Sequence, residues 1–218
     1  IGTWSGAASA QTEKGDIGLI WVDAHMDAHT FETSPSKNIH GMPIAALLGH
    51  GSPELTHIGS SYAKIKPEHL CLVGIRDYEP GEEALLESLN VRVIKIEEVH
   101  KRGTHDCMQE AFDIVNQAPG GFGLSIDLDC FDPSHAPAVG TPVSNGLDVE
   151  AFCHSLSGMP NEDLLGIEIA EFNPDLDHNN ATLNLFNPLL EYCFSHLIDH
   201  TKTTPKQKAH ADDVFATA

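Results

Sequence analysis

The chain has 218 residues, 12 of them basic and 32 acidic, which gives a formal net charge of −20 at pH 7. This length is enough for one sizeable hydrophobic core. So acidic a chain repels nucleic acid and anionic membrane surfaces, and it favours cationic ligands such as metal ions or guanidinium compounds. No run approaches about 18 apolar residues, so the sequence predicts no membrane span.

The first predicted elements are a helix of small residues at 5–13 and a buried strand at Ile17–Val22. The strand is almost wholly apolar, as expected for a central strand of a parallel sheet that is covered on both faces. Asp23, His25 and Asp27 follow at a spacing of two, and in an extended chain such side chains point to one side. We expect them at the carboxyl end of the strand, where open parallel sheets bind ligands.

Strand and helix patterns then alternate along the chain. A polar loop at 29–40 contains Ser, Pro and Asn, which disfavour regular structure. We expect strands at 70–75, 91–96, 121–129 and 164–169, and helices at 42–48, 80–89, 105–116, 149–156 and 181–198, the last with Pro188 in its first turn or at a kink. This alternation predicts an α/β fold, a doubly wound and mainly parallel sheet in a three-layer α/β/α sandwich. We expect a single domain at 1–199 and a disordered tail at 200–218.

A second acidic pair, Asp127 and Asp129, follows the apolar run that begins at Gly121. If the two strands are neighbours, four carboxylates occupy one small volume, and they stay ionised only if a cation offsets them. Carboxylates with one imidazole and no Cys favour Mn²⁺ over structural Zn²⁺ or Mg²⁺, although Co²⁺ and Ni²⁺ accept similar ligands. Taken alone, the Asp-x-His pattern would also suit an ordinary turn after a strand.

The remaining motifs exclude other chemistries. The sequence has no Gly-rich phosphate loop and no Gly-x-Ser-x-Gly elbow, so nucleotide and serine-hydrolase chemistry are unsupported. Five cysteines are odd in number and widely spread, at Cys71, Cys107, Cys130, Cys153 and Cys193. We expect them to be reduced and structural, which suits the cytoplasm.

Three motifs resemble the signatures of the ureohydrolase family, which comprises arginases, agmatinases and formiminoglutamases. They are Asp23-Ala-His-Met-Asp27, Ser125-Ile-Asp-Leu-Asp129 with Asp132-Pro133, and Glu171-Phe-Asn-Pro174. The resemblance extends from the first residue to about residue 190 and is closest to bacterial-type arginases. The family's Gly-Gly-Asp-His motif, with its first His ligand, is absent, so the sequence looks like a fragment without an N-terminal portion and its first strand.

The resemblance implies a dimanganese hydrolase that cleaves the guanidinium group of L-arginine to urea and L-ornithine by a metal-bridging hydroxide. Asp23 and Asp127 would bridge two Mn²⁺ ions, His25 and Asp129 would complete one site, and Asp27 would belong to the other. We expect the first site to bind metal and the second to be weak. Homo-oligomers, trimers or hexamers, are common in the family.

The resemblance also implies roles for polar residues outside the metal ligands. Asp27 would pass a proton to the leaving amine, and His40 in Asn-Ile-His-Gly-Met-Pro would shuttle protons to solvent. Glu171 would pair with the guanidinium, and Thr141 would support that geometry by hydrogen bonding.

Substrate choice would rest on polar loops. Ser34 and Ser36 match positions that contact the amino acid carboxylate in arginases, and Glu79 matches an acid that recognises the α-amino group. His29 stands where animal arginases usually have Asn, which could retune the pocket. These residues favour L-arginine, with agmatine or another guanidino or formimino substrate as alternatives. An inactive fragment that binds metal is the alternative from a different class.

Overall fold

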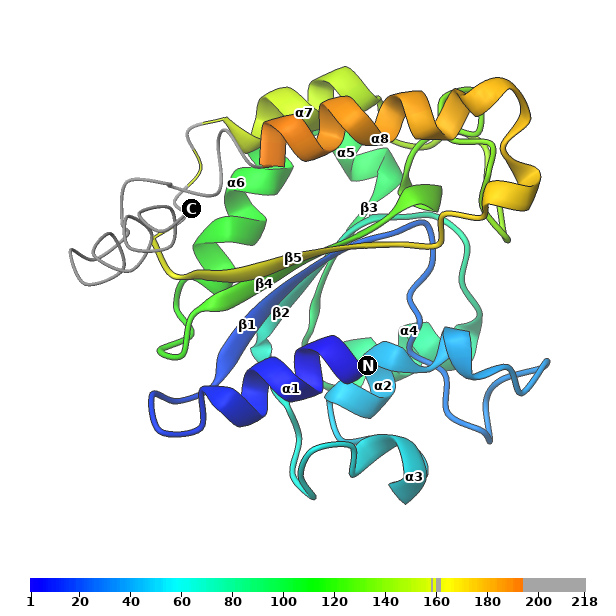
Figure 1. Ribbon diagram of the computed structural model, residues 1–218. Helices are drawn as coiled ribbons and strands as arrows, with labels where there is room; N and C mark the ends of the chain where they lie inside the picture. The colour runs from blue at the N-terminus through cyan, green and yellow to red at the C-terminus, as the bar shows by residue number, and fades with distance from the viewer. Residues whose placement is uncertain (158, 160–161, 194–218) are drawn as a thin grey trace, which may run out of the picture.

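A five-stranded, all-parallel sheet forms the centre of the computed structural model, which describes residues 1–157, 159 and 162–193 (Figure 1). The strands are β1 (Ile17–Val22), β2 (Ile65–Ile75), β3 (Arg92–Lys95), β4 (Phe122–Asp127) and β5 (Leu164–Ala170), in the order β3-β2-β1-β4-β5. The helices are α1 (Gly2–Ala10), α2 (Pro43–Leu47), α3 (Pro53–Thr56), α4 (Pro80–Ser88), α5 (Ile96–Arg102), α6 (Thr104–Val115), α7 (Val149–Leu156) and α8 (Ala181–Tyr192). The predicted α/β fold class is confirmed.

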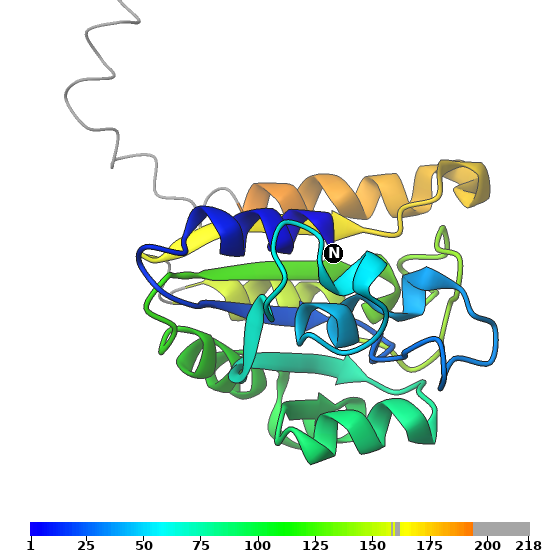
Figure 2. The same cartoon turned by 90° about the horizontal axis from the view of Figure 1, so that it is seen from below.

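Both faces of the sheet are covered, which makes the three-layer sandwich. Side chains alternate along a strand, so β1 sends Ile20 and Val22 to one face and Leu19 and Trp21 to the other. The first face packs against α5, α6, α7 and α8, and the second against α1, α2 and α4 (Figures 1 and 2). This double burial explains why β1 reads as an uninterrupted apolar run.

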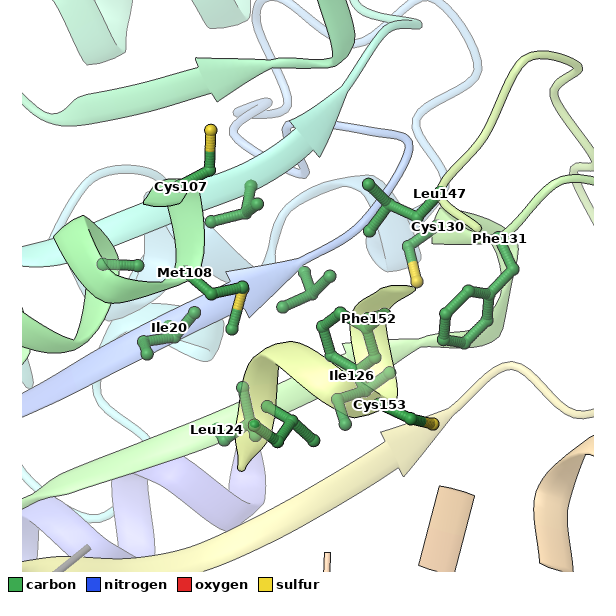
Figure 3. Packing of buried hydrophobic residues seen from close by; sticks show 14 of the residues in the cluster. Ile20, Cys107, Met108, Leu124, Ile126, Cys130, Phe131, Leu147, Phe152 and Cys153 are labelled. Atoms are coloured by element: carbon green, nitrogen blue, oxygen red, sulfur yellow. The ribbon is translucent and has the colours of Figure 1, made fainter. Parts of the chain in front are cut away.

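The first core cluster reaches the segment that follows β4. Figure 3 shows Phe152 of α7 beside Phe131, and the two ring centroids lie 5.4 Å apart in an edge-on arrangement. Cys130 and Cys153 belong to the same cluster. All five cysteines are buried and free, as the sequence predicted for structural thiols. Apolar packing against α7 therefore holds the turn after β4 in place.

Helix α1 is held against β4 and β5 by one tryptophan. A Cβ atom at Gly123 would lie 1.9 Å from the ring of Trp4, so only glycine leaves room for the indole. The indole N–H donates a hydrogen bond to Glu168 of β5 at 2.9 Å. A polar bond at the edge of an apolar contact thus fixes where the helix lies.

Several predicted boundaries were wrong for local reasons. Helix α1 runs from Gly2 to Ala10 rather than 5–13. Strand β2 begins at Ile65 rather than at residue 70, and its first half was missed because that half is polar and half-exposed and so has no apolar pattern. Helix α5 was not predicted. Of the two placements expected for Pro188, in the first turn or within the helix at a kink, the structure has it within α8.

Other predictions fall on residues outside the described ranges. They are the end of the closing helix at 194–198 and the tail at 200–218. Among the described residues, no helix is both long and apolar enough to cross a bilayer.

The order of the strands reverses beside β1. The chain proceeds outward from β1 to β2 and β3, and then returns to place β4 and β5 on the other side of β1. At such a switch point the two connections diverge and leave a crevice outside the carboxyl ends of the strands. The first polar residues after β1 and β4 meet there.

Candidate metal centre and substrate pocket

The ends of β1 and β4 bring two carboxylates to one edge of the sheet. Val22 pairs with Ile126, so Asp23 and Asp127 emerge side by side. Asp23, Asp127 and Asp129 are all buried. The condition stated for the sequence, that the two strands with acidic ends be neighbours, is therefore met.

Turns, rather than extended strands, aim the other polar side chains. Strand β4 ends at Asp127, and Asp129 lies in a 3-10 turn at Leu128–Cys130, where its N–H donates to Asp127 Oδ1 at 2.9 Å. In the same way, the N–H of His25 donates to Asp23 Oδ1 at 2.7 Å. The prediction of a strand through Asp129 was wrong, because a side-chain carboxylate competes with the sheet for the next backbone N–H.

Asp23, His25 and Asp129 form a compact cluster. His25 Nδ1 lies 3.2 Å from Asp129 Oδ2 and 3.4 Å from Asp23 Oδ1. One ligand atom from each residue lies within 4.8 Å of the other two. Hydrogen bonds to the second carboxylate oxygens fix the acids, from the Trp21 indole to Asp23 at 2.8 Å and from the Ala24 N–H to Asp129 at 3.2 Å.

Without a cation, burial and mutual repulsion make it unfavourable for all the carboxylates of the cluster to be ionised. Burial raises the pKa of Asp23 to about 7, and it raises the pKa values of Asp27 and Asp127 well above the ordinary range, with neighbouring aspartates adding to each shift. Burial opposes protonation of His25, but hydrogen bonds to Asp129 and Asp23 raise the pKa of His25 to about 11. Protons thus take the place of a cation. Carboxylate oxygens with one imidazole fit a divalent ion, which would displace those protons.

One pocket gathers every predicted site residue. Its lining includes Asp23, His25, Asp27, His29, Ser34, Ser36, His40, Glu79, Asp127, Asp129, Thr141 and Glu171. His40 is exposed at the rim, and Glu171 follows β5 with its backbone in the left-handed region at φ 66°. Asp27 also has a positive φ of 49°. Such conformations are uncommon outside glycine and occur often at functional sites.

Thr141 contacts an acid of the cluster. Its hydroxyl donates to Asp129 Oδ2 at 3.2 Å, so it holds a carboxylate that also faces His25. Its predicted support of Glu171 stays a prediction.

A second group, His29, Glu79 and Glu82, lines the same pocket. His29 Nε2 lies 2.9 Å from Glu79 Oε2 and 3.3 Å from Glu82 Oε2, and its Nδ1 lies 3.0 Å from the Thr33 hydroxyl. Glu82 also accepts from the backbone N–H groups of Ala28 and Glu79, which ties the loop after β1 to the start of α4. The imidazole of His29 therefore fixes one carboxylate oxygen of Glu79.

The sequence reasoning missed three polar residues near the site. Asp77 and Glu82 line the pocket, and Arg76 lies beneath it. A signal was present, because Arg76 and Asp77 follow the apolar run of β2 in the same way as Asp23 follows β1. The capping box between Glu79 and Glu82 was a second signal.

The fold and pocket together define a parallel α/β protein with the donor set of a divalent-cation site at the switch point of its sheet. Comparison with known proteins gives the family. The sequence matches the Arginase family over residues 1–195, and the chain belongs to that family. The resemblance to ureohydrolases seen in the sequence is thereby confirmed.

Two bacterial relatives illustrate the match. The arginase of Bacillus caldovelox is 40% identical over 195 residues, which cover 89% of this chain and 64% of the relative; its crystal structure superimposes with a TM-score of 0.81 over 89% of this chain and 67% of that one. The structure of Bacillus cereus arginase is 33% identical with a TM-score of 0.81, covering 88% and 66%. The chain thus spans about 64% of the length of its first curated relatives.

Proposed function

We propose that this chain carries the site of a metal-dependent hydrolase that cleaves the guanidinium group of L-arginine to urea and L-ornithine. The observation that carries this proposal is the convergence, in one pocket, of the acidic cluster with Glu171 and the polar loop of Ser34 and Ser36. The names of relatives that are 40% identical, both called arginases, support it.

The residues present fit a pair of divalent ions. Asp23, His25 and Asp129 would hold one ion, and Asp127 and Asp27 would face a second; Mn²⁺ is the ion that we propose. When bound, such ions lower the pKa of water enough to supply hydroxide near neutral pH. The three clustered ligands make the first site the stronger one.

The chain's own side chains would bind the substrate and move protons. Glu171 would pair with the guanidinium at the mouth of the pocket, where its carboxylate is exposed. Asp27, which lines the pocket beside the acidic cluster, would carry a proton to the leaving amine. His40, exposed at the rim, would exchange protons with solvent.

Recognition of the amino acid end would come from the loop after β1 and the start of α4. Ser34 and Ser36 would contact the carboxylate, while Glu79, held by His29, would contact the α-ammonium. Agmatine has no carboxylate, so this set favours L-arginine. We also propose a cytoplasmic homo-oligomer, a trimer or hexamer, as the family resemblance implies.

Urea release tests the proposal. The protein, expressed as its gene encodes it, would be loaded with Mn²⁺ and assayed with L-arginine and agmatine side by side. Urea from L-arginine alone is the expected result. Urea from agmatine alone would assign the activity of an agmatinase instead. No urea from either substrate would favour a scaffold that binds metal without turnover.

A further inference from the structure

Arg76 follows directly after β2, and its guanidinium lies against the backbone of Asp129, one of the acids of the cluster. Its guanidinium faces six backbone carbonyl oxygens from three separate segments. Nε donates to Ser144 at 3.2 Å, Nη1 to Gly74 and Cys130 at 3.2 Å each, and Nη2 to Val143 at 2.7 Å, Asp129 at 2.8 Å and Phe131 at 3.4 Å. An arginine has five N–H donors, so one of them is shared and all are engaged.

These carbonyls belong to the segments that carry the acids of the pocket. The turn at 129–131 holds Asp129, and the loop ending at 143–144 carries Thr141, whose hydroxyl donates to Asp129. Backbone bonds tie the turn to Leu147, and the Asp132 carboxylate ties it to the N–H groups of Asn145 and Gly146. The Arg76 guanidinium adds the connection from the turn to Val143 and Ser144, nearer to Thr141.

The positive charge of Arg76 makes no direct hydrogen bond to a carboxylate in the part of the chain that the structure describes. Each of its hydrogen bonds ends on a neutral carbonyl, while the negative charges of Asp129 and Asp23 act on it from the pocket side. A fixed positive charge at this position offsets part of the repulsion among the buried carboxylates. Lysine, with three donors and no planar fork, could not reproduce both effects.

We propose that Arg76 is the positioning residue of the metal centre, which fixes the 129–131 turn against the 141–144 loop so that Asp129 is held ready for a divalent cation. The inference rests on the proposed function, because it assumes that the pocket binds such a cation.

The test compares Arg76→Lys with Arg92→Lys. Arg92 is a matched control because its guanidinium also makes several hydrogen bonds, to Glu98, Glu110 and the carbonyl of Val93, but it lies outside the pocket. Both variants keep the charge and lose the planar fork. The measurements are the dissociation constants of Mn²⁺ and Co²⁺ by calorimetry, the visible spectrum of bound Co²⁺, and the melting temperature without metal.

We expect Arg76→Lys to bind both metals at least about tenfold more weakly and to show an altered Co²⁺ spectrum, as for other residues that orient metal ligands. Arg92→Lys should keep the wild-type affinity and spectrum at a similar loss of melting temperature. Wild-type affinity in Arg76→Lys would overturn the proposal. So would an Arg76 variant that fails to fold beside a folded Arg92→Lys, because it would assign Arg76 to the fold alone.

The same experiment separates this inference from the proposed function. Wild-type protein that binds Mn²⁺ but releases no urea would count against the hydrolase and leave the comparison of variants decisive. Wild-type protein that binds neither metal would overturn both.

Discussion

Asp129 is reached by polar groups from three directions. His25 lies on one side, the Thr141 hydroxyl on another, and the Ala24 N–H on a third. Although burial raises its pKa, the hydrogen bond and charge of His25 lower that pKa below its usual value. Asp129 is therefore the acid of the cluster best prepared to remain ionised when a cation arrives.

Replacing Asp129 by Asn should remove the metal. The amide keeps the shape but loses the charge, so we expect metal affinity to fall at least about 100-fold, and urea release with it. Asp113→Asn, an exposed acid on α6 and outside the pocket, is the control. Elemental analysis after dialysis measures the change, and unaltered metal content in Asp129→Asn would remove the dimetal mechanism from consideration.

Ser36 offers a test of substrate choice. We expect Ser36→Ala to raise KM for L-arginine about tenfold, because a hydrogen bond to a charged carboxylate is lost, and to leave any slow turnover of agmatine unchanged. Ser88→Ala, on α4 and outside the pocket, is the control. Equal losses on both substrates would show that Ser36 shapes the loop rather than reads the carboxylate.

At the scale of single residues, the sequence predicted the acids that follow the strands, but it did not predict the residues that hold those acids in place through the backbone. Asp23 and Asp127 could be placed because parallel strands end at a common edge. Arg76 was missed although it follows the apolar run of β2, because its partners are backbone carbonyls and no sequence pattern marks such a role. The path of Asp129 was also hidden, since an Asx turn and a strand share the same spacing of two.

Among the elements, α1 depends on the missing side chain of Gly123. We expect Gly123→Ala to destabilise the protein by about 1–3 kcal/mol, because its Cβ would overlap the Trp4 ring. Gly166 pairs with Gly123 in the next strand and has open space around it, so Gly166→Ala is a matched control. Thermal unfolding should separate the two variants by several degrees, and equal melting temperatures would contradict the packing of α1.

The loop between β4 and α7 depends on Asp132. Its carboxylate accepts from the hydroxyl and N–H of Ser134 and from the N–H groups of Asn145 and Gly146, and these bonds lower the pKa of Asp132 to about 2. A depressed folded-state pKa stabilises the protein above the unfolded value near 4, and this stabilisation is lost as pH falls from about 4 to 2.

We therefore expect Asp132→Asn to melt at a lower temperature than wild type at pH 7, with a difference that disappears toward pH 2. Asp113→Asn, an exposed acid on α6, serves as the control. A difference independent of pH would mean that shape rather than charge holds the loop.

Elements with a strong pattern were predicted, and those without one were not. The strands at β1 and β4 are apolar throughout, and helix α6 buries Met108, Ala111 and Phe112 at helical spacing. Helix α5 has only two buried residues in seven, so its caps and charges were the sole signals. Helix α3 has four residues, which is too short for any period to appear.

For the whole molecule, the acidic pocket links folding to metal. Mn²⁺ at about 100 times its dissociation constant should stabilise the native state by about 2.7 kcal/mol, which corresponds to about 5 to 10 °C in melting temperature, and a chelator should reverse the effect. At a fixed Mn²⁺ concentration the gain should grow with pH, because the ion must displace the proton of His25, whose pKa is about 11, and below pH 7 that of Asp23 as well. Calorimetric scans at pH 6, 7 and 8 measure it, and a gain that shrinks with pH would argue against His25 as a ligand.

Trp21 gives the molecule an optical property of its own. Its indole donates directly to Asp23, and the sequence contains only one other tryptophan, Trp4, which belongs to α1 and packs against Gly123. Arrival of a divalent ion at Asp23 would change the electric field at the Trp21 ring and hence its fluorescence. In a Trp4→Phe background, the emission of a single native side chain would then report occupancy of the centre during a titration, without any attached dye.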